Sequence, residues 1–342
     1  MLASLQDILD TVKSNTLTYQ QKLMCLGNIA ERLFDPRELL GYTDEEWQFL
    51  QNQMICDLNE GYAIYRPRYI LPDYNVYIKK GCEFLELPAP KNLDDALDGL
   101  LILYSHVPSI TTFPVYIGRL DMLLDPFITD EEQDYIKIKR FLNHVDKTVP
   151  DSFCHANIGP YDTKAGRLIL KAVIELEAPT PNMTIRYDKN KTSREFAELA
   201  AKACLLVSKP SFANDAYYIS DLGEQYGIAS CYNALPECGG AYTLTRLRLG
   251  TIARACKTVD EMVNELLPRV AKCALSTMDK RHKFVVEESN FFNTSFLEKE
   301  GFIKRTNFTG MFAIVGLADA ANHLLQQEGL NETFGKSQRG DE

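Results

Sequence analysis

The spacing of apolar residues predicts helices in the first third of the chain. Leu5, Ile8, Leu9 and Val12 lie three or four positions apart or adjacent, which places them on one face of an N-terminal helix. A second stripe indicates a helix that begins near residue 93, with apolar positions at Leu93, Ala96, Leu97, Leu100, Leu101 and Tyr104. Between the two, tyrosines and prolines follow no helical period, so residues 1–92 are expected to form a helical and loop-rich N-terminal layer.

Beyond residue 118 the pattern alternates between helical and strand-like runs. Three pairs of residues at capping-box spacing mark expected helix starts: Thr129 with Glu132, Thr192 with Glu195, and Thr258 with Glu261. Short apolar runs bounded by Gly, Pro, Asn or Asp indicate strands at 153–158, 183–187, 216–219 and 227–231. The sequence therefore predicts an α/β core over residues 93–328, followed by a polar tail over 329–342.

The charge distribution excludes several classes of partner. The chain has 37 Lys and Arg against 47 Asp and Glu, a net charge of −10, and no basic block. Neither a nucleic-acid polymer nor an anionic membrane is therefore expected to bind. Asp7 and Asp10 interrupt the apolar core that a secretory signal needs, and nine cysteines without a Cys-x-x-Cys pair are typical of a reducing compartment. We expect a cytoplasmic protein.

Standard cofactor motifs are missing from the sequence. It contains neither the Gly-x-Gly-x-x-Gly of dinucleotide-binding folds nor the Gly-x-Ser-x-Gly of hydrolases. The five histidines are not paired at metal-ligand spacing, and no two pairs of cysteines complete a zinc site. We expect no metal site.

Three segments carry more polar groups than a generic core needs. A strand that contains Arg186 is followed, after a helix, by the dipeptide Asn214-Asp215, so an arginine, an amide and a carboxylate are expected at strand ends. A short apolar strand then runs into a turn whose tip carries Cys231. In the third segment, glycines separate a polar turn containing Asn307 from a buried strand and helix.

Together these segments resemble the glycyl-radical enzymes, the superfamily of pyruvate formate-lyase and the anaerobic ribonucleotide reductases, and most closely its YjjI-type branch. The matching stretch runs from about residue 151 to about residue 325. Its most specific part is Ile228-Ala-Ser-Cys231, which is similar to the family's cysteine loop; Thr-Ile-Arg186, Asn214-Asp215 and Ile314-Val-Gly316-Leu also fall in family order. The resemblance implies an α/β fold with a ten-stranded barrel of two five-stranded half-sheets surrounded by helices.

Within that fold, the resemblance implies that Cys231 relays a radical between a glycine near the C-terminus and a small organic substrate. No cofactor would bind directly, because an iron–sulfur, S-adenosylmethionine-dependent activating enzyme installs the radical on the glycine. The glycyl loop of the family, roughly Arg-Val-x-Gly-Tyr, is absent, and the late glycines lie in the polar tail. We therefore expect the barrel to be incomplete at the C-terminus, as in a truncation before the radical domain.

Two departures narrow the chemistry that the resemblance implies. The pyruvate formate-lyase pattern has two adjacent cysteines, whereas Ser230 precedes Cys231, which disfavours formate-lyase chemistry. Diol and amine eliminases of the family place a glutamate two residues after the cysteine, where this chain has Asn233, so their general base is missing. The substrate stays undefined.

Beside Cys231, the candidate substrate-binding residues are Arg186, Asn214, Asp215, His155, Asn233 and Asn307. Arg186 and Asp215 form either a buried ion pair or a contact to substrate. Because successive strand residues alternate, Cys154 is expected to face the barrel interior with His155 pointing away. Cys238, beside Gly239 and Gly240, is expected where the backbone turns toward a following helix.

Two functions stay open on the sequence. In the first, the chain is the barrel portion of a glycyl-radical enzyme that acts anaerobically on a small molecule, with an activating enzyme as partner and a homodimer as one arrangement. In the second, the chain is an inactive truncated fragment, or a binding or scaffold protein that keeps the barrel without radical chemistry.

Overall fold

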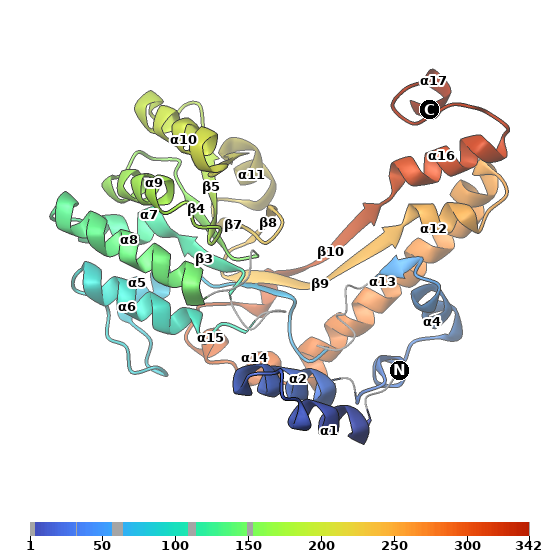
Figure 1. Ribbon diagram of the computed structural model, residues 1–342, viewed down its shortest axis with the longest axis horizontal. Coiled ribbons are helices and arrows are strands. Elements are labelled where there is room, and N and C mark those ends of the chain that lie inside the picture. The colour runs from blue at the N-terminus through green and yellow to red at the C-terminus, as the bar shows by residue number, and fades with distance from the viewer. Residues whose placement is uncertain (1–3, 32, 57–63, 109–113, 149–152, 342) are drawn as a thin grey trace. The chain divides into compact units, whose positions relative to one another are not determined.

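The structure is a computed structural model that describes residues 4–31, 33–56, 64–108, 114–148 and 153–341 (Figure 1). Contacts divide the chain into two compact units. Unit 1 comprises Met1–Arg66, Tyr242–Asn290 and Gly310–Glu342, and unit 2 comprises Pro67–Ala241 and Phe291–Thr309. All the candidate site residues belong to unit 2, and strands β9 (Gly239–Arg248) and β10 (Phe308–Val315) contribute residues to both units.

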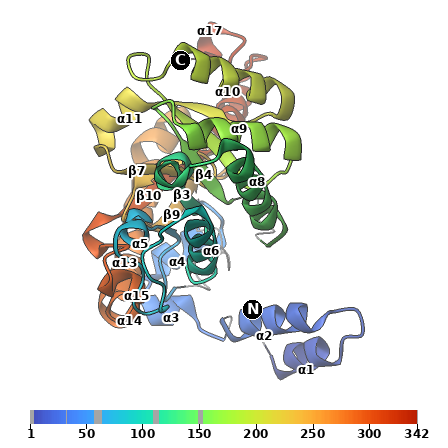
Figure 2. The ribbon, with the colours of Figure 1, turned by 90° about the vertical axis from the view of Figure 1, so that its left-hand side faces the viewer.

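A four-stranded parallel sheet forms the centre of unit 2. Its strands follow in chain order: β3 (Tyr116–Arg119), β4 (His155–Ile158), β5 (Asn182–Tyr187) and β6 (Ser211–Asn214). Parallel neighbours need a long crossover, and each crossover contains a helix: α8 (Glu131–Thr148), α9 (Lys164–Leu176) and α10 (Arg194–Val207). The three helices pack as consecutive neighbours (Figure 2).

The two faces of this sheet differ in polarity. Ala156, Ile158, Met183 and Ile185 point to one face and are buried. On the other face, polar side chains alternate with them. We call this set the polar face: His155, Asn157, Thr184 and Arg186 are buried, and Asn182 and Ser211 are partly buried. Parallel strands that are covered on both sides are usually apolar on both faces. A polar face is therefore a candidate location for a functional site.

The remaining elements of unit 2 surround the sheet. A two-stranded antiparallel hairpin of β7 (Tyr226–Ala229) and β8 (Asn233–Pro236) packs on β3 and β4. The other elements are β2 (Tyr69–Leu71), α5 (Asn75–Lys80), α6 (Leu93–Tyr104), α7 (Leu120–Leu124), α11 (Asp215–Leu222), α14 (Phe291–Thr294) and α15 (Phe296–Lys299). Strand β2 pairs with the start of β9, so that Ile70 lies opposite Gly240.

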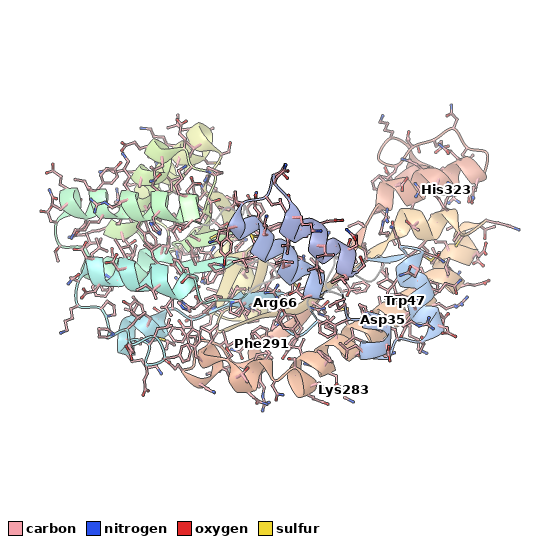
Figure 3. All side chains as sticks on the ribbon, turned by 60° about the horizontal axis from the view of Figure 1, so that its bottom comes forward. Asp35, Trp47, Arg66, Lys283, Phe291 and His323 are labelled. Atoms are coloured by element: carbon pink, nitrogen blue, oxygen red, sulfur yellow. The ribbon has the colours of Figure 1, made fainter. Side chains whose placement is uncertain are left out.

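Unit 1 is largely helical. Its helices are α1 (Leu5–Lys13), α2 (Tyr19–Glu31), α3 (Pro36–Leu40), α4 (Asp44–Gln51), α12 (Leu249–Arg254), α13 (Leu267–Lys283), α16 (Leu317–Gln327) and α17 (Gln338–Asp341). Strand β1 (Ile55–Cys56) pairs antiparallel with the end of β9. Apolar residues of α4, α12, α13 and α16 share one core, and Figure 3 marks Trp47 on α4 and His323 on α16.

Several predicted elements are confirmed and others are displaced. The stripe from Leu93 to Tyr104 is helix α6. The hydroxyl of Thr258 accepts the N–H of Glu261, at the start of the helical segment that includes Glu261–Leu266, as the capping-box spacing predicted. The other two caps lie one residue later than expected: Asp130 accepts the N–H of Glu132, and Ser193 accepts that of Phe196.

The strand expected at 216–219 is wrong. These residues lie in α11, because the side chain of Asn214 accepts the N–H of Tyr217 and so starts a helix there. No closed ten-stranded barrel is found among the described residues. Within the same part of the chain, no helix has the length and apolar character that crossing a bilayer requires.

Gly240 is expected to tolerate no side chain. A Cβ atom there would lie 2.0 Å from the carbonyl oxygen of Tyr69, on the paired strand β2. Gly240→Ala should therefore lower the free energy of unfolding by about 3 kcal/mol or more, measured by urea denaturation. Gly27→Ala, within helix α2, is the control, because its Cβ meets no atom within 4 Å and its φ is not positive, so stability should stay the same or rise by up to about 1 kcal/mol. Equal losses in the two variants would contradict this packing.

Candidate functional site

Cys231 lies at the tip of the hairpin formed by β7 and β8. Ala229 pairs with Asn233, which leaves Ser230, Cys231 and Tyr232 as the turn. We call residues 226–236 the cysteine hairpin. Ser230 and Tyr232 both adopt the left-handed conformation, at φ 55° and 64°, which is uncommon for residues with side chains and is concentrated at functional sites. The thiol between them is exposed, as a group that reacts with a small molecule must be.

Asn157 fixes the middle of the cysteine hairpin to the parallel sheet. Its amide nitrogen donates to the carbonyl oxygen of Ile228 at 2.9 Å, and its amide oxygen accepts the N–H of Ile228 at 2.8 Å. All four groups are buried, so these two bonds satisfy a strand edge that water does not reach. The two hydrogen bonds of the Asn157 side chain therefore fix the position of β7 relative to β4.

Asn157→Leu is expected to destabilise the chain strongly. It leaves the N–H and C=O of Ile228 buried without these partners, which costs about 2–4 kcal/mol in the free energy of unfolding. Asn214→Ala is a matched control, since the exposed Asn214 only caps α11 and its loss costs about 1 kcal/mol. Chemical denaturation of both variants measures the difference, and a cost of Asn157→Leu at or below that of the control would refute the anchoring role.

An ion pair holds the base of the cysteine hairpin. Arg186 Nε donates to Asp215 Oδ1 at 2.7 Å, and both side chains are almost fully buried. The hydroxyl of Tyr226 donates to the same oxygen at 2.8 Å, while Arg186 Nη1 donates to the carbonyl oxygen of Tyr226 at 3.2 Å. The guanidinium also lies over the Tyr226 ring, 3.8 Å from its centroid. Of the two roles left open for this pair, the structure contains the ion pair; contact with substrate stays a prediction.

Glu237 continues from β8 into the buried base of the hairpin. Its Oε1 accepts the hydroxyl of Tyr116 at 3.1 Å. Burial, reinforced by the negative charge of Asp73, raises the pKa of the Glu237 carboxyl to about 7. Cys238 follows in a left-handed turn, but the next element is strand β9 rather than the expected helix.

His155 lies beside the tip of the cysteine hairpin. Its ring meets that of Tyr232 edge to face, with 5.0 Å between the centroids. The expected arrangement of Cys154 and His155 is therefore reversed: His155 belongs to the polar face, and the buried Cys154 lies near Tyr74 and Tyr104.

The structure does not bring all the candidate residues to the thiol. His155 and Asn233 lie at the tip of the hairpin, and Arg186 and Asp215 lie at its base. Asn214 caps α11 with its side chain, and the backbone of Asn307 packs against Gly239, beyond the base. Their roles in binding substrate stay predictions.

Sequence reasoning missed Asn157, Tyr232 and the Tyr116–Glu237 pair. The signal for Asn157 was present in the alternation of His155-Ala-Asn157-Ile, which places two polar residues on one face of a short strand. The partners of these residues lie up to 121 positions away along the chain, so no local pattern identifies them.

The site is thus an exposed cysteine in a tight turn, beside a sheet face lined with mostly buried polar groups. A family model for YjjI-like glycyl radical enzymes matches residues 17–342. The chain belongs to the YjjI-like glycyl radical enzyme family. Family and mixed α/β fold, as predicted from the sequence, are confirmed.

Curated relatives extend beyond the matched region. A Haemophilus influenzae protein, described as uncharacterized, is 92% identical over 342 residues, which is 100% of this chain and 66% of that protein. The uncharacterized protein YjjI of Escherichia coli is 44% identical over 334 residues, 97% of this chain and 64% of that protein. The chain therefore spans about two thirds of the length of these relatives.

Solved structures agree on the fold. The anaerobic ribonucleotide reductase from Thermotoga maritima, crystallised with citrate in its active site, matches with a TM-score of 0.72. The match covers 98% of this chain and 73% of that chain at 13% sequence identity, so it shows a shared fold.

Proposed function

We propose that this chain supplies the thiyl half of a glycyl-radical reaction, with Cys231 as the catalytic residue. The observation that carries the proposal is the anchoring of an exposed thiol: Asn157 holds the middle of its hairpin and Arg186 holds the base. Such fixed placement supports chemistry in which the sulfur must meet a particular hydrogen atom of a bound molecule.

The proposed reaction cycle conserves atoms and electrons. A glycyl radical takes the hydrogen atom of the Cys231 thiol, which breaks the S–H bond and completes the glycine C–H bond. The resulting thiyl takes a hydrogen atom from a C–H bond of the small organic substrate, which leaves the radical on the substrate. After rearrangement, the product radical takes that hydrogen atom back from sulfur. The thiyl formed again in this step takes the hydrogen atom back from the glycine, which restores both the thiol and the glycyl radical. The polar face holds the substrate and limits the access of solvent during these steps.

The source of the radical is part of the proposal. The glycine would be on a segment outside the match described here, and an iron–sulfur, S-adenosylmethionine-dependent activating enzyme would install the radical on it. A cytoplasmic location, with a homodimer as one arrangement, completes the proposal. The low share of the relatives' length that this chain covers, 64% to 66%, agrees with a radical segment elsewhere in those proteins.

The test uses the Haemophilus influenzae relative, which contains the matching sequence and is longer. It is activated without oxygen by its radical-forming enzyme, and consumption of small polar molecules is followed by NMR. The proposal predicts a glycyl radical signal in electron paramagnetic resonance and loss of at least one compound only after activation. A radical signal with no consumption across the panel would favour the non-catalytic alternative, and the same protein without its activating enzyme serves as the reference.

A further inference from the structure

Asn157 and Arg186 hold the cysteine hairpin, but His155, on the same polar face, forms no such contact within the part of the chain that the structure describes, and the role of its buried imidazole is unexplained. The side chain is fully buried, and its Nε2 atom has no hydrogen-bond partner among the described residues. Nδ1 lies 3.5 Å from the carbonyl oxygen of Phe153. Because a carbonyl oxygen only accepts, Nδ1 carries the proton in this contact and Nε2 presents a bare lone pair. A buried polar atom without a partner costs about 1–3 kcal/mol, so a fold that keeps one needs a reason.

The imidazole stays neutral in this environment. Burial lowers the pKa of His155 to about 4, the carbonyl of Phe153 opposes this lowering, and the positive charge of Lys209 adds to it. Lys209 Nζ donates to the carbonyl oxygens of Ala178 and Pro181 and so is engaged with the backbone. At neutral pH, Nε2 is therefore an acceptor rather than a donor.

The other groups of the polar face carry no unbalanced charge. Asn182 is the register partner of His155 on β5. Farther along the face, Thr184 Oγ1 lies 2.7 Å from Ser211 Oγ. The guanidinium of Arg186 is balanced by Asp215. The oxygens of a bound carboxylate or phosphate have no proton to donate, so their lone pairs would repel the lone pair of Nε2. A hydroxyl group would instead donate a hydrogen bond to Nε2.

Tyr232 packs against His155 at the hairpin tip. Its ring lies at 82° to the plane of the imidazole, and its side chain is half exposed. Tyr232 directly follows Cys231, so the residue that covers the imidazole is part of the same turn as the thiol.

We infer that His155 Nε2 accepts a hydrogen bond from a hydroxyl group of the substrate, and that the substrate is an uncharged, hydroxyl-bearing small molecule. The inference rests on the proposed function for the role of Cys231. His155 is then a specificity-determining residue: it selects a donor group and rejects anions at the end of the substrate that it contacts. Tyr232 covers the imidazole until the substrate replaces it.

The test measures the imidazole directly and needs no radical. The 342-residue chain is labelled with ¹⁵N in its histidines, and their nitrogen resonances are recorded by NMR while ethylene glycol, acetate or phosphate is added. The resonance that is lost in His155→Gln identifies His155, and the other four histidines report non-specific effects. We expect the Nδ1–H form of a neutral ring at pH 7, and a saturable shift of Nε2 with ethylene glycol but not with acetate or phosphate.

Tyr232→Ala supplies a second measurement. Removing the ring opens the imidazole, so half-saturation should occur at about tenfold lower ethylene glycol concentration. A proton on Nε2 would overturn the inference, as would a shift caused by acetate or phosphate and not by ethylene glycol, or an unchanged Nε2 signal in both proteins. The NMR titration involves no turnover, so none of these results bears on the role of Cys231. In the same way, a failure of the radical assay would not change what the titration shows about His155.

Discussion

Replacing Cys231 by serine is expected to abolish turnover by the activated Haemophilus influenzae relative. The serine side chain keeps the shape of the cysteine, but its O–H bond is far stronger than an S–H bond, so it does not give up a hydrogen atom to a glycyl radical. We expect a loss of at least about a thousandfold, equivalent to about 4 kcal/mol of transition-state stabilisation. The substrate found by NMR in the consumption assay provides the measurement.

Cys238→Ser is the matched control for this loss. Cys238 lies at the other end of β8 and is buried, with its Sγ 3.7 Å from the carbonyl oxygen of Gly301, and burial raises the pKa of its thiol to about 11. A serine hydroxyl can donate to the same carbonyl, so turnover should stay within about threefold of the parent protein. Activity that survives in Cys231→Ser and vanishes in Cys238→Ser would reverse the assignment of the two cysteines.

The second large effect is expected at the base of the cysteine hairpin. Arg186→Met leaves the Asp215 carboxylate buried, with Lys191 Nζ at 3.7 Å as its remaining cation. Breaking a buried ion pair from one side costs about 3–5 kcal/mol in the free energy of unfolding. The double variant Arg186→Met with Asp215→Leu removes both charges, so it should recover more than half of that loss. Urea denaturation of the single and double variants measures both quantities.

Arg194→Met is the control for the loss of an arginine. Arg194 pairs with Glu198 one helical turn away, and both side chains are exposed, so this pair contributes less than about 1 kcal/mol. An Arg186→Met loss as small as that of Arg194→Met would show that the buried pair does not hold the hairpin. A double variant less stable than the single one would contradict the charge argument and favour packing of the guanidinium on Tyr226.

Local signals in the sequence predicted the elements whose causes are local. The stripe that ends at Tyr104 and the cap at Thr258 depend on residues a few positions apart, and both are found as expected. The strand expected at 216–219 failed for a local reason that was overlooked, since Asn214 is an N-cap and the following apolar residues belong to its helix. Apolar runs of this length fit a strand and a buried helix equally well.

The site was predictable only where the family signature marks it. Ile228-Ala-Ser-Cys231 predicts the cysteine loop because the motif is contiguous, and the catalytic role of Cys231 stays a prediction. The side chains that hold this loop are not contiguous with it: Asn157 lies 71 positions before Ile228, and Tyr116 lies 121 positions before Glu237. Their contribution depends on the order of the parallel strands, which pattern alone does not give, and the surroundings of His155 depend on what packs on each face of β4.

The most direct test of the account is hydrogen exchange at the glycyl radical in heavy water. The radical carbon carries one hydrogen, which splits its resonance signal into a doublet. If Cys231 relays the radical, its S–D group gives deuterium to the glycine and the thiyl then takes back the original hydrogen, so the doublet collapses with time. We expect this collapse in the activated Haemophilus influenzae relative and in its Cys238→Ser variant, and a persistent doublet in Cys231→Ser. Collapse at an unchanged rate in Cys231→Ser would contradict the central claim.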